Sequence, residues 1–281
     1  MLVQKPYCTS FYYRYTQPLS SEQPIKFMSA PRFYVPQLAQ LTRGCLNDAE
    51  ARHAASVLRL TVDDRLQLFD GRGREAEGRV VSIGRGSLQY EVLEWLDRDH
   101  ELAHSLTLAI ALPKGDRQKT LVDAATELGV SSLIPLRSER SVAQPTANAL
   151  QRLTRGVIEA SKQCGRNRLM EIVEPRTIAD LGGSSPTSDG EVAPELPPLR
   201  FVAHPYDNAE SHKPLAQLLS GSQRAVEIAV GPEGGFTDPE IVQLVAGGWQ
   251  AVSLGPTILR VEIAALAAVA QIAAWLHNTP A

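Results

Sequence analysis

The sequence has few features of metal, disulfide or membrane chemistry. Its 281 residues include three cysteines, an odd number without metal-ligand spacing, which argues against a disulfide framework and a zinc site. The longest apolar stretch, close to the C-terminus, is interrupted by Glu262, Gln271 and His277, so it is typical of a buried helix rather than a membrane span. We therefore expect a cytoplasmic protein with no metal and no membrane segment.

The common phosphate-binding motifs are also missing. No Gly-Lys-Ser or Gly-Lys-Thr ending marks a P-loop, and no Gly-x-Gly-x-x-Gly marks a dinucleotide site. The chain has instead two Gly-Pro turns, in VGPEGGF (230–236) and LGPTILR (254–260), each after an apolar segment. A triphosphate or dinucleotide ligand is therefore disfavoured, and these two turns become the candidate binding loops.

Glycine lets the main chain approach a ligand closely and bind it through N–H and C=O groups. Ligands of open α/β sheets bind beyond the carboxyl ends of the strands, where both turns are expected. A pocket built of such loops, with little positive charge, suits the neutral adenine and ribose of S-adenosylmethionine better than phosphates. The alternative is that VGPEGGF is only a tight structural turn.

Charge is distributed unevenly along the chain, although the net charge is only −3. Between Arg137 and Arg168, seven basic residues stand against two acidic ones, whereas residues 180–255 carry ten acidic and three basic residues. One interpretation is a solvated, basic helix face. The other is a surface that contacts phosphates and steers a polyanion to an otherwise acidic protein.

The pattern of the chain divides it into three parts. Residues 1–28 lack periodicity and are expected to be a disordered extension, whose presence in the mature protein stays open. Residues 29–103 contain short alternating segments and turn signals such as Asp70-Gly71, which predict a small β-barrel, with a capped helix over 47–58. Residues 104–281 alternate between strand and helix patterns, which predicts an α/β domain with a largely parallel sheet.

Within the α/β part, apolar runs predict strands and periodic segments predict helices. The expected strands are 106–112, 132–136, 199–204, 225–230 and 251–254, and the expected helices are 117–128, 147–164, 238–246 and 259–276. A stretch rich in Gly, Ser, Pro and Glu, residues 182–198, is expected to be a flexible insert.

Six motifs occur in an order that resembles one family. LPKGDR, ATELGV, SERSV, EASKQCGR, VGPEGGF and LGPTILRVE together resemble the bacterial RsmE family, the 16S rRNA (uracil-N3) methyltransferases of the SPOUT superfamily. The resemblance covers about residues 29–281. It implies a PUA-like barrel that assists RNA binding and a SPOUT domain with a deep trefoil knot around S-adenosylmethionine. It also implies a homodimer that acts on assembled 30S subunits, at a uridine near the decoding centre.

The resemblance assigns site residues to this chain. The implied cofactor-binding residues are Leu136, Val230, Gly231, Pro232, Glu233, Gly234, Gly235, Leu254, Gly255, Ile258, Leu259 and Arg260. Candidate RNA contacts are Arg32, His53, Arg59, Lys114, Arg117, Arg140, Lys162, Arg166 and Arg168. The chain departs from the family pattern at Thr257 and Ile263, which touch the cofactor segment, and at Ala124 in the ATELG segment.

The chemistry restricts the catalytic candidates. Methyl transfer is an in-line displacement, and uracil N3 must lose its proton, so an arginine beside the base oxygens would favour the anion. We expect Arg140 and Arg166 to contact the RNA or the base, and consider Glu233 and Arg260 as further catalytic candidates. Alternatives are ion pairs with neighbouring glutamates for the arginines, and a purely structural role for Glu233.

Two other functions remain compatible with these residues. A ribose 2′-O methyltransferase would keep the SPOUT fold but change the acceptor atom. An RNA-binding assembly factor would keep the fold without catalysis, and cofactor affinity would distinguish it from both enzymes.

Overall fold

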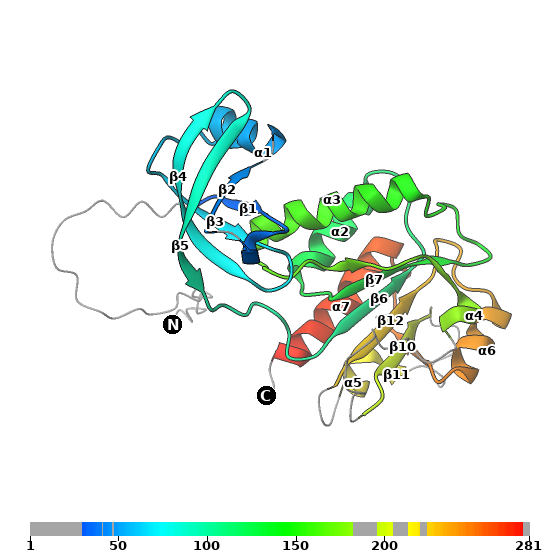
Figure 1. The fold of residues 1–281 in the computed structure, drawn as a ribbon. Coiled ribbons are helices and arrows are strands. Elements are labelled where there is room, and N and C mark those ends of the chain that lie inside the picture. The colour runs from blue at the N-terminus through cyan, green and yellow to red at the C-terminus, as the bar shows by residue number, and fades with distance from the viewer. Residues whose placement is uncertain are drawn as a thin grey trace, which may run out of the picture.

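The computed structural model describes residues 30–40, 42–46, 48–181, 196–204, 213–219 and 224–277. The expected extension, residues 1–28, and most of the expected insert, residues 182–198, lie outside these described residues. The described chain contains one mainly antiparallel sheet followed by a larger parallel sheet covered by helices (Figure 1).

The N-terminal sheet has five strands: β1 (Arg32–Tyr34), β2 (Arg43–Leu46), β3 (Arg65–Phe69), β4 (Glu75–Gly84) and β5 (Ser87–Leu96). Their spatial order is β1-β3-β4-β5-β2, and only the β1–β3 pair is parallel. The alternation in β3 buries Leu66 and Leu68 completely, together with Phe33 and Val80. We call this sheet the barrel sheet.

Short helical elements accompany the barrel sheet. They are η1 (Leu38–Gln40), α1 (Asp48–Arg52) and η2 (His53–Val57), a single π-helical turn that continues α1. The helix predicted for residues 47–58 is therefore present, but its second half is wound as a π-helix.

The second sheet consists of parallel strands throughout. It contains β6 (Leu106–Ile110), β7 (Ser132–Arg137), β8 (Glu171–Ile172), β10 (Leu199–Ala203), β11 (Lys213–Pro214), β12 (Val226–Val230) and β13 (Gln250–Ser253). The order is β11-β13-β10-β12-β6-β7-β8, with β9 (Arg176–Thr177) paired to β7. This arrangement confirms the predicted α/β class with a parallel sheet.

Helices cover both faces of the parallel sheet (Figure 1). One face carries α2 (Arg117–Glu127), α3 (Ala147–Cys164) and α7 (Val261–His277), and the other carries α4 (Ile178–Leu181) and α6 (Asp238–Ala246). A short helix, α5 (Leu215–Leu218), contacts α7. Side chains of β6 alternate between the faces, because Leu108 and Ile110 join the α2, α3 and α7 core while Ala109 joins the α6 core.

Local signals set the helix ends. Thr146 caps α3 by accepting a hydrogen bond from the Ala149 N–H at 3.3 Å, and Gly165 ends it in the left-handed region at φ 87°. Thr237 and Glu240 form a capping box at the start of α6. The predicted bounds of α3 and α6 are confirmed, whereas α7 begins at Val261 instead of Leu259.

The barrel sheet is joined to the parallel sheet by the segment that follows α3. The Gly73 N–H donates to the Asn167 carbonyl at 3.1 Å, and the Leu169 N–H donates to the Gly71 carbonyl at 3.0 Å. The Asn167 side chain donates to the Arg98 carbonyl at 2.8 Å. We call these contacts, together with those of Arg166, the joint.

Candidate functional site

A pocket of about 190 Å³ lies beyond the carboxyl ends of β10, β12 and β13. Two loops and the first turns of α7 form its walls. The lining residues are Ala203, His204, Val230, Gly231, Pro232, Glu233, Gly235, Phe236, Leu254, Gly255, Pro256, Thr257, Ile258, Leu259, Val261 and Ala264. The sequence positions both Gly-Pro loops at one site because each follows a strand of the same parallel sheet.

Glycine is required where the first loop turns back on itself. The Gly235 N–H donates to the Pro232 carbonyl at 2.8 Å, with Gly235 at φ +70°, a region that side chains disfavour. A Cβ on Gly231 would lie 3.1 Å from the backbone nitrogen of Phe236, a tighter contact than most real Cβ atoms make. The loop is therefore compact and presents main-chain groups to the pocket.

The turn after β7 holds the first loop from outside. Arg140 Nη1 donates to the Gly234 carbonyl at 2.8 Å, and the Glu139 N–H donates to Glu240 Oε1 at 2.9 Å. The other oxygen of Glu240 accepts the Thr237 N–H at 2.8 Å. One carboxylate thus caps α6 and anchors the turn that carries Arg140.

An ion-pair network connects the first pocket loop to the first turn of α7, which follows the second loop, through Arg117 at the start of α2. Arg117 Nη2 lies 3.0 Å from Glu233 Oε1, and its Nη1 lies 3.4 Å from Glu262 Oε2. Glu262 is buried in the first turn of α7, where the helix dipole favours a negative charge, and its Oε1 is 4.0 Å from Arg260. Arg117 is 38% exposed, so we expect a modest energy from each pair.

The sequence matches two RNA methyltransferase profiles. The RNA methyltransferase domain family matches residues 100–273, and the RNA methyltransferase PUA domain family matches residues 46–93. A Synechocystis protein named ribosomal RNA small subunit methyltransferase E is 33% identical over 93% of this chain and 83% of its own length. The protein of that name from Rickettsia conorii is 33% identical over 80% of this chain and 87% of its own length.

This chain belongs to the RsmE family. Solved structures agree with that assignment. A methyltransferase from Legionella pneumophila, in complex with S-adenosylmethionine, superimposes with a TM-score of 0.75 at 26% identity, over 88% of this chain and 98% of its own. Ribosomal RNA small subunit methyltransferase E from Neisseria gonorrhoeae, also bound to S-adenosylmethionine, superimposes with a TM-score of 0.71 at 29% identity. The match covers 86% of this chain and 96% of that chain.

Most cofactor candidates drawn from the RsmE resemblance line the pocket. These are Val230, Gly231, Pro232, Glu233, Gly235, Leu254, Gly255, Ile258 and Leu259. Three candidates do not line it. Leu136 is fully buried, Gly234 accepts the hydrogen bond from Arg140, and Arg260 is exposed at the start of α7.

Sequence reasoning missed several lining residues. Ala203 ends β10 and His204 follows it, and Phe236, Val261 and Ala264 complete the wall. Ala203 and His204 could have been found from the predicted strand 199–204. Its carboxyl end lies at the same edge of the parallel sheet as the two Gly-Pro loops. The two apolar residues of α7 carry no such signal, because core positions and pocket positions look alike in sequence.

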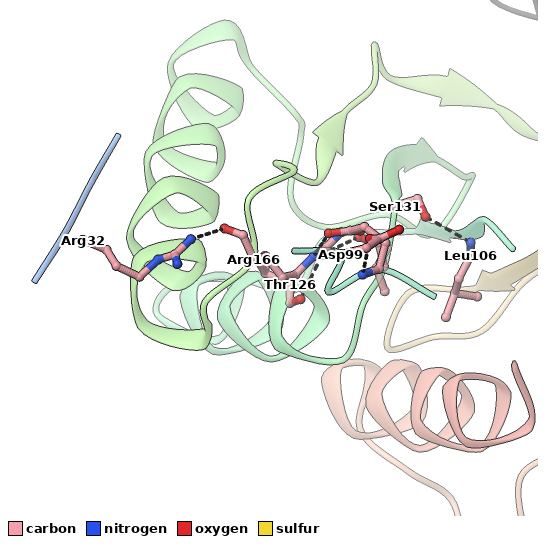
Figure 2. Close-up of polar contacts among 8 residues, drawn as sticks. Arg32, Asp99, Leu106, Thr126, Ser131 and Arg166 are labelled. Atoms are coloured by element: carbon pink, nitrogen blue, oxygen red, sulfur yellow. Dashed lines mark hydrogen bonds and ion pairs between the residues drawn. The ribbon is translucent and has the colours of Figure 1, made fainter. Parts of the chain in front are cut away.

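Arg166 differs most from its expected role. The residue is 3% exposed and lies in the joint (Figure 2). Its Nε donates to Glu101 Oε1 at 3.0 Å, its Nη2 donates to the other Glu101 oxygen, and its Nη1 donates to the carbonyls of Thr126 and Val130 at 2.9 Å each. These bonds occupy the whole guanidinium and give Arg166 a structural role in the joint, while its predicted part in catalysis and RNA binding stays a prediction.

Two other RNA candidates are also engaged within the protein. Arg32 has a side chain only 9% exposed; it donates to Glu75 Oε1 at 2.5 Å and to the Arg166 carbonyl at 3.1 Å (Figure 2). Lys162 pairs with Glu50 and, at 3.0 Å, with Glu159. Burial lowers the pKa of Lys162, but the hydrogen bonds to both glutamates outweigh burial and leave that pKa raised. These contacts hold both side chains within the protein, and their RNA contacts stay a prediction.

The remaining RNA candidates lie at the surface. His53, Arg59, Lys114, Arg140 and Arg168 are exposed, and Arg117 belongs to the ion-pair network. Among the described residues, no group of His, Cys, Asp and Glu is arranged to hold a metal ion. In the same part of the chain, no helix is long and apolar enough to cross a membrane.

Proposed function

We propose that this protein uses S-adenosylmethionine to methylate N3 of a uridine in 16S rRNA, within the 30S ribosomal subunit. The observation that carries the proposal is the pocket of two Gly-Pro loops at the strand ends, in a chain whose relatives include structures bound to this cofactor. The relatives' names support small-subunit ribosomal RNA as the substrate.

The lining residues fit S-adenosylmethionine better than a phosphate cofactor. Among the described residues that line the pocket there is no lysine or arginine, and Glu233 is the carboxylate. Main-chain groups of residues 231–235 and 254–259 are suited to hold adenine and ribose, and a carboxylate is compatible with a cationic ligand. When bound, this cofactor supplies an electrophilic methyl group on a sulfonium.

The protein's own residues have to activate the acceptor. The proton on uracil N3 must leave before or as the new N–C bond forms, and the negative charge then spreads to the base oxygens. Arg140 is exposed, is fixed to the first loop through the Gly234 carbonyl, and is the arginine we assign to stabilising that anion. Glu233, held by Arg117, keeps the first loop in place beside the reacting groups.

The pocket occupies the end of a domain that we place at residues 104–281, with a PUA-like RNA-binding domain at residues 29–103. We further propose the deep trefoil knot of the SPOUT fold. Its support is that β13 lies beyond β10, away from β12, while α7 returns to contact β6, β12 and α2. We place the protein in the cytoplasm with its ribosomal substrate.

A homodimer is part of the same proposal. Ile258, at the pocket, is 91% exposed, and Ile263 on α7 is 46% exposed. Exposing these apolar side chains to water is unfavourable, and contact with a second copy of the chain would bury them. Sedimentation of the wild type and of Ile263→Asp tests this point. A dimer that the substitution dissociates supports the proposal, whereas a monomeric wild type contradicts it.

The experiment for the function is incubation of purified protein and S-adenosylmethionine with 30S subunits that lack the modification. Nucleoside mass spectrometry of the 16S rRNA then identifies the product. The proposal predicts 3-methyluridine, with a rate at least tenfold lower for Arg140→Gln, since one lost charge-stabilising group costs about that much or more. Arg155→Gln, an exposed arginine of α3, is the matched control.

Other products would assign other functions. A 2′-O-methyl nucleoside would make the protein a ribose methyltransferase. No product, combined with tight RNA binding and no measurable cofactor affinity, would make it an assembly factor.

A further inference from the structure

An exposed tryptophan lies beside the joint. Trp95, near the end of β5, is 47% exposed, in a part of the protein where most large aromatic side chains are buried. It lines a shallow hollow together with Gly73, Arg74, Glu75, Leu96 and Asp97. An exposed indole beside a hollow offers a flat face on which a nucleic-acid base can stack.

Arg74 lines the hollow, and two further arginines, Arg72 and Arg168, lie on the segments that adjoin it. Arg72 and Arg74 are exposed on the turn between β3 and β4, and Arg168 reaches it from the segment after α3. A Cβ on Gly73 would lie 2.8 Å from Cζ of Arg168, so this guanidinium lies directly against the turn. Backbone pairing of Arg168 with Gly71 and Arg72 fixes the two segments together.

These three guanidiniums are available for a ligand. In the described part of the chain, none of Arg72, Arg74 and Arg168 forms an ion pair with a carboxylate. Asp70 is buried and accepts the backbone N–H groups of Arg72 and Arg74 at 2.7 and 3.0 Å, so its charge shapes the turn.

The carboxylates at the hollow do not cancel this charge. Glu75 is buried and bound to Arg32, with Arg98 3.9 Å away. Asp97 is the exposed carboxylate of the lining. Three unpaired arginines against Asp97 leave a surface that favours an anion.

The hollow and the cofactor pocket lie at opposite ends of the parallel sheet. The joint contacts Thr126 and Val130, which precede β7, whereas the pocket begins where β10 and β12 end. Since a five-residue strand is about 16 Å long, the two sites are separated by at least roughly that distance. A ligand at the hollow is therefore too far from the pocket of the same chain to be the nucleotide that is methylated there.

We propose that this surface, Arg72, Arg74, Trp95 and Arg168, is a second RNA-binding site that holds a single-stranded segment of the substrate. A base stacks on Trp95 and the adjoining phosphates bind the three arginines. The inference rests on the proposed function in one respect, since it takes the ligand to be RNA. It assigns recognition of a flanking segment to the joint, apart from the acceptor nucleotide at the pocket.

The test is fluorescence anisotropy of a 5′-labelled, twelve-nucleotide single-stranded oligouridylate with the full chain, without cofactor. We expect Trp95→Ala to raise the Kd about tenfold, the scale of one lost stacking contact, and Trp95→Phe to stay within about threefold because a ring remains. We expect Arg168→Gln to reduce the slope of log K against log salt by about 0.7, the value for one phosphate contact on a single strand.

Controls separate a lost site from a lost fold. Arg65→Gln changes an exposed arginine of the barrel sheet that pairs with Glu77, and it should bind the oligouridylate like the wild type. Cofactor affinity, measured by calorimetry, should be equal in Trp95→Ala and the wild type, because the pocket lies at the other end of the sheet.

Two results would overturn the inference: unchanged affinity in Trp95→Ala with an unchanged salt slope in Arg168→Gln, or an equal loss in Arg65→Gln. The binding measurements do not depend on which methylated nucleoside the protein forms. Stacking at Trp95 could be found in a protein that forms another product, and could be absent from one that forms 3-methyluridine. The inference and the proposed function can therefore fail separately.

Discussion

The two ends of the parallel sheet use arginine in opposite ways. At the amino ends, Arg166 is buried and its guanidinium is bound by Glu101 and two carbonyls, which locks the joint. At the carboxyl ends, Arg117 is partly exposed and Arg140 is exposed, and both bind the first pocket loop. The amino ends provide rigidity, and the carboxyl ends provide a site formed largely by glycine and proline backbone.

The comparison shows that an arginine's neighbourhood in sequence does not determine its role. Arg140 and Arg166 belong to the same basic segment and to motifs of the same family, yet only Arg140 lies beside the pocket loop. The difference arises from what each side chain meets after folding. Arg166 meets Glu101, whose backbone N–H is in turn bound by Asp99 (Figure 2). Neither carboxylate is near Arg166 in the sequence.

The largest expected effect is on stability, from Arg166→Met. The substitution leaves Glu101 and two buried carbonyls without their partner, which typically costs about 3 to 5 kcal/mol of unfolding free energy. Urea unfolding measures it, with Arg155→Met on the exposed face of α3 as the control. If the variant kept its stability but lost methyl transfer, Arg166 would have a catalytic role, and the contrast between the two ends of the sheet would not hold.

Gly231→Val should act at the pocket instead. Its Cβ would crowd the Phe236 backbone and its methyl groups would enter the lining, so we expect the cofactor Kd to rise at least tenfold, or about 1.4 kcal/mol. Calorimetry with S-adenosylmethionine measures this. Gly156→Ala is the matched glycine control: its Cβ would make ordinary contact with Val122 at 3.4 Å, and helix propensity should stabilise the protein slightly. Equal cofactor affinity in Gly231→Val and wild type would contradict the assigned pocket.

Arg117→Gln should have an intermediate effect. It separates the first pocket loop and the first turn of α7 from α2, and leaves the buried Glu262 with only the more distant Arg260. Because Arg117 is partly exposed, we expect a threefold to tenfold rise in cofactor Kd, on the order of 1 kcal/mol. Arg117→Lys should recover part of it. A loss of RNA affinity with unchanged cofactor affinity would instead support the RNA-contact role predicted from sequence.

The smallest effect is expected at Lys162→Met, a residue at the barrel side of α3. Losing its pairs with Glu50 and Glu159 should cost about 1 kcal/mol near neutral pH. Since the folded pKa of Lys162 is raised, this stabilisation is present below the ordinary lysine value of 10.5 and is lost as pH rises through the higher folded value. Chemical unfolding at neutral and strongly alkaline pH checks this, and a stability difference that persists at the higher pH contradicts the assignment.

Periodicity and turn chemistry predicted much of the fold. The α6 helix was readable from its capping residues Thr237 and Glu240, and the pocket loops from their glycines after apolar strands. Two-residue strands such as β8 and β11 were not predicted, since they are too short to show alternation. The joint was also hidden, because a contact such as that of Arg166 with Glu101 depends on residues far apart in the chain.

The most direct test of the account is a crystal structure of the protein grown with S-adenosylmethionine. We predict the cofactor between the loops 231–235 and 254–259, bound mainly by main-chain groups, with Arg166 still buried in the joint. Cofactor density elsewhere on the molecule, or an Arg166 side chain turned toward the cofactor, would contradict the division between the two ends of the sheet.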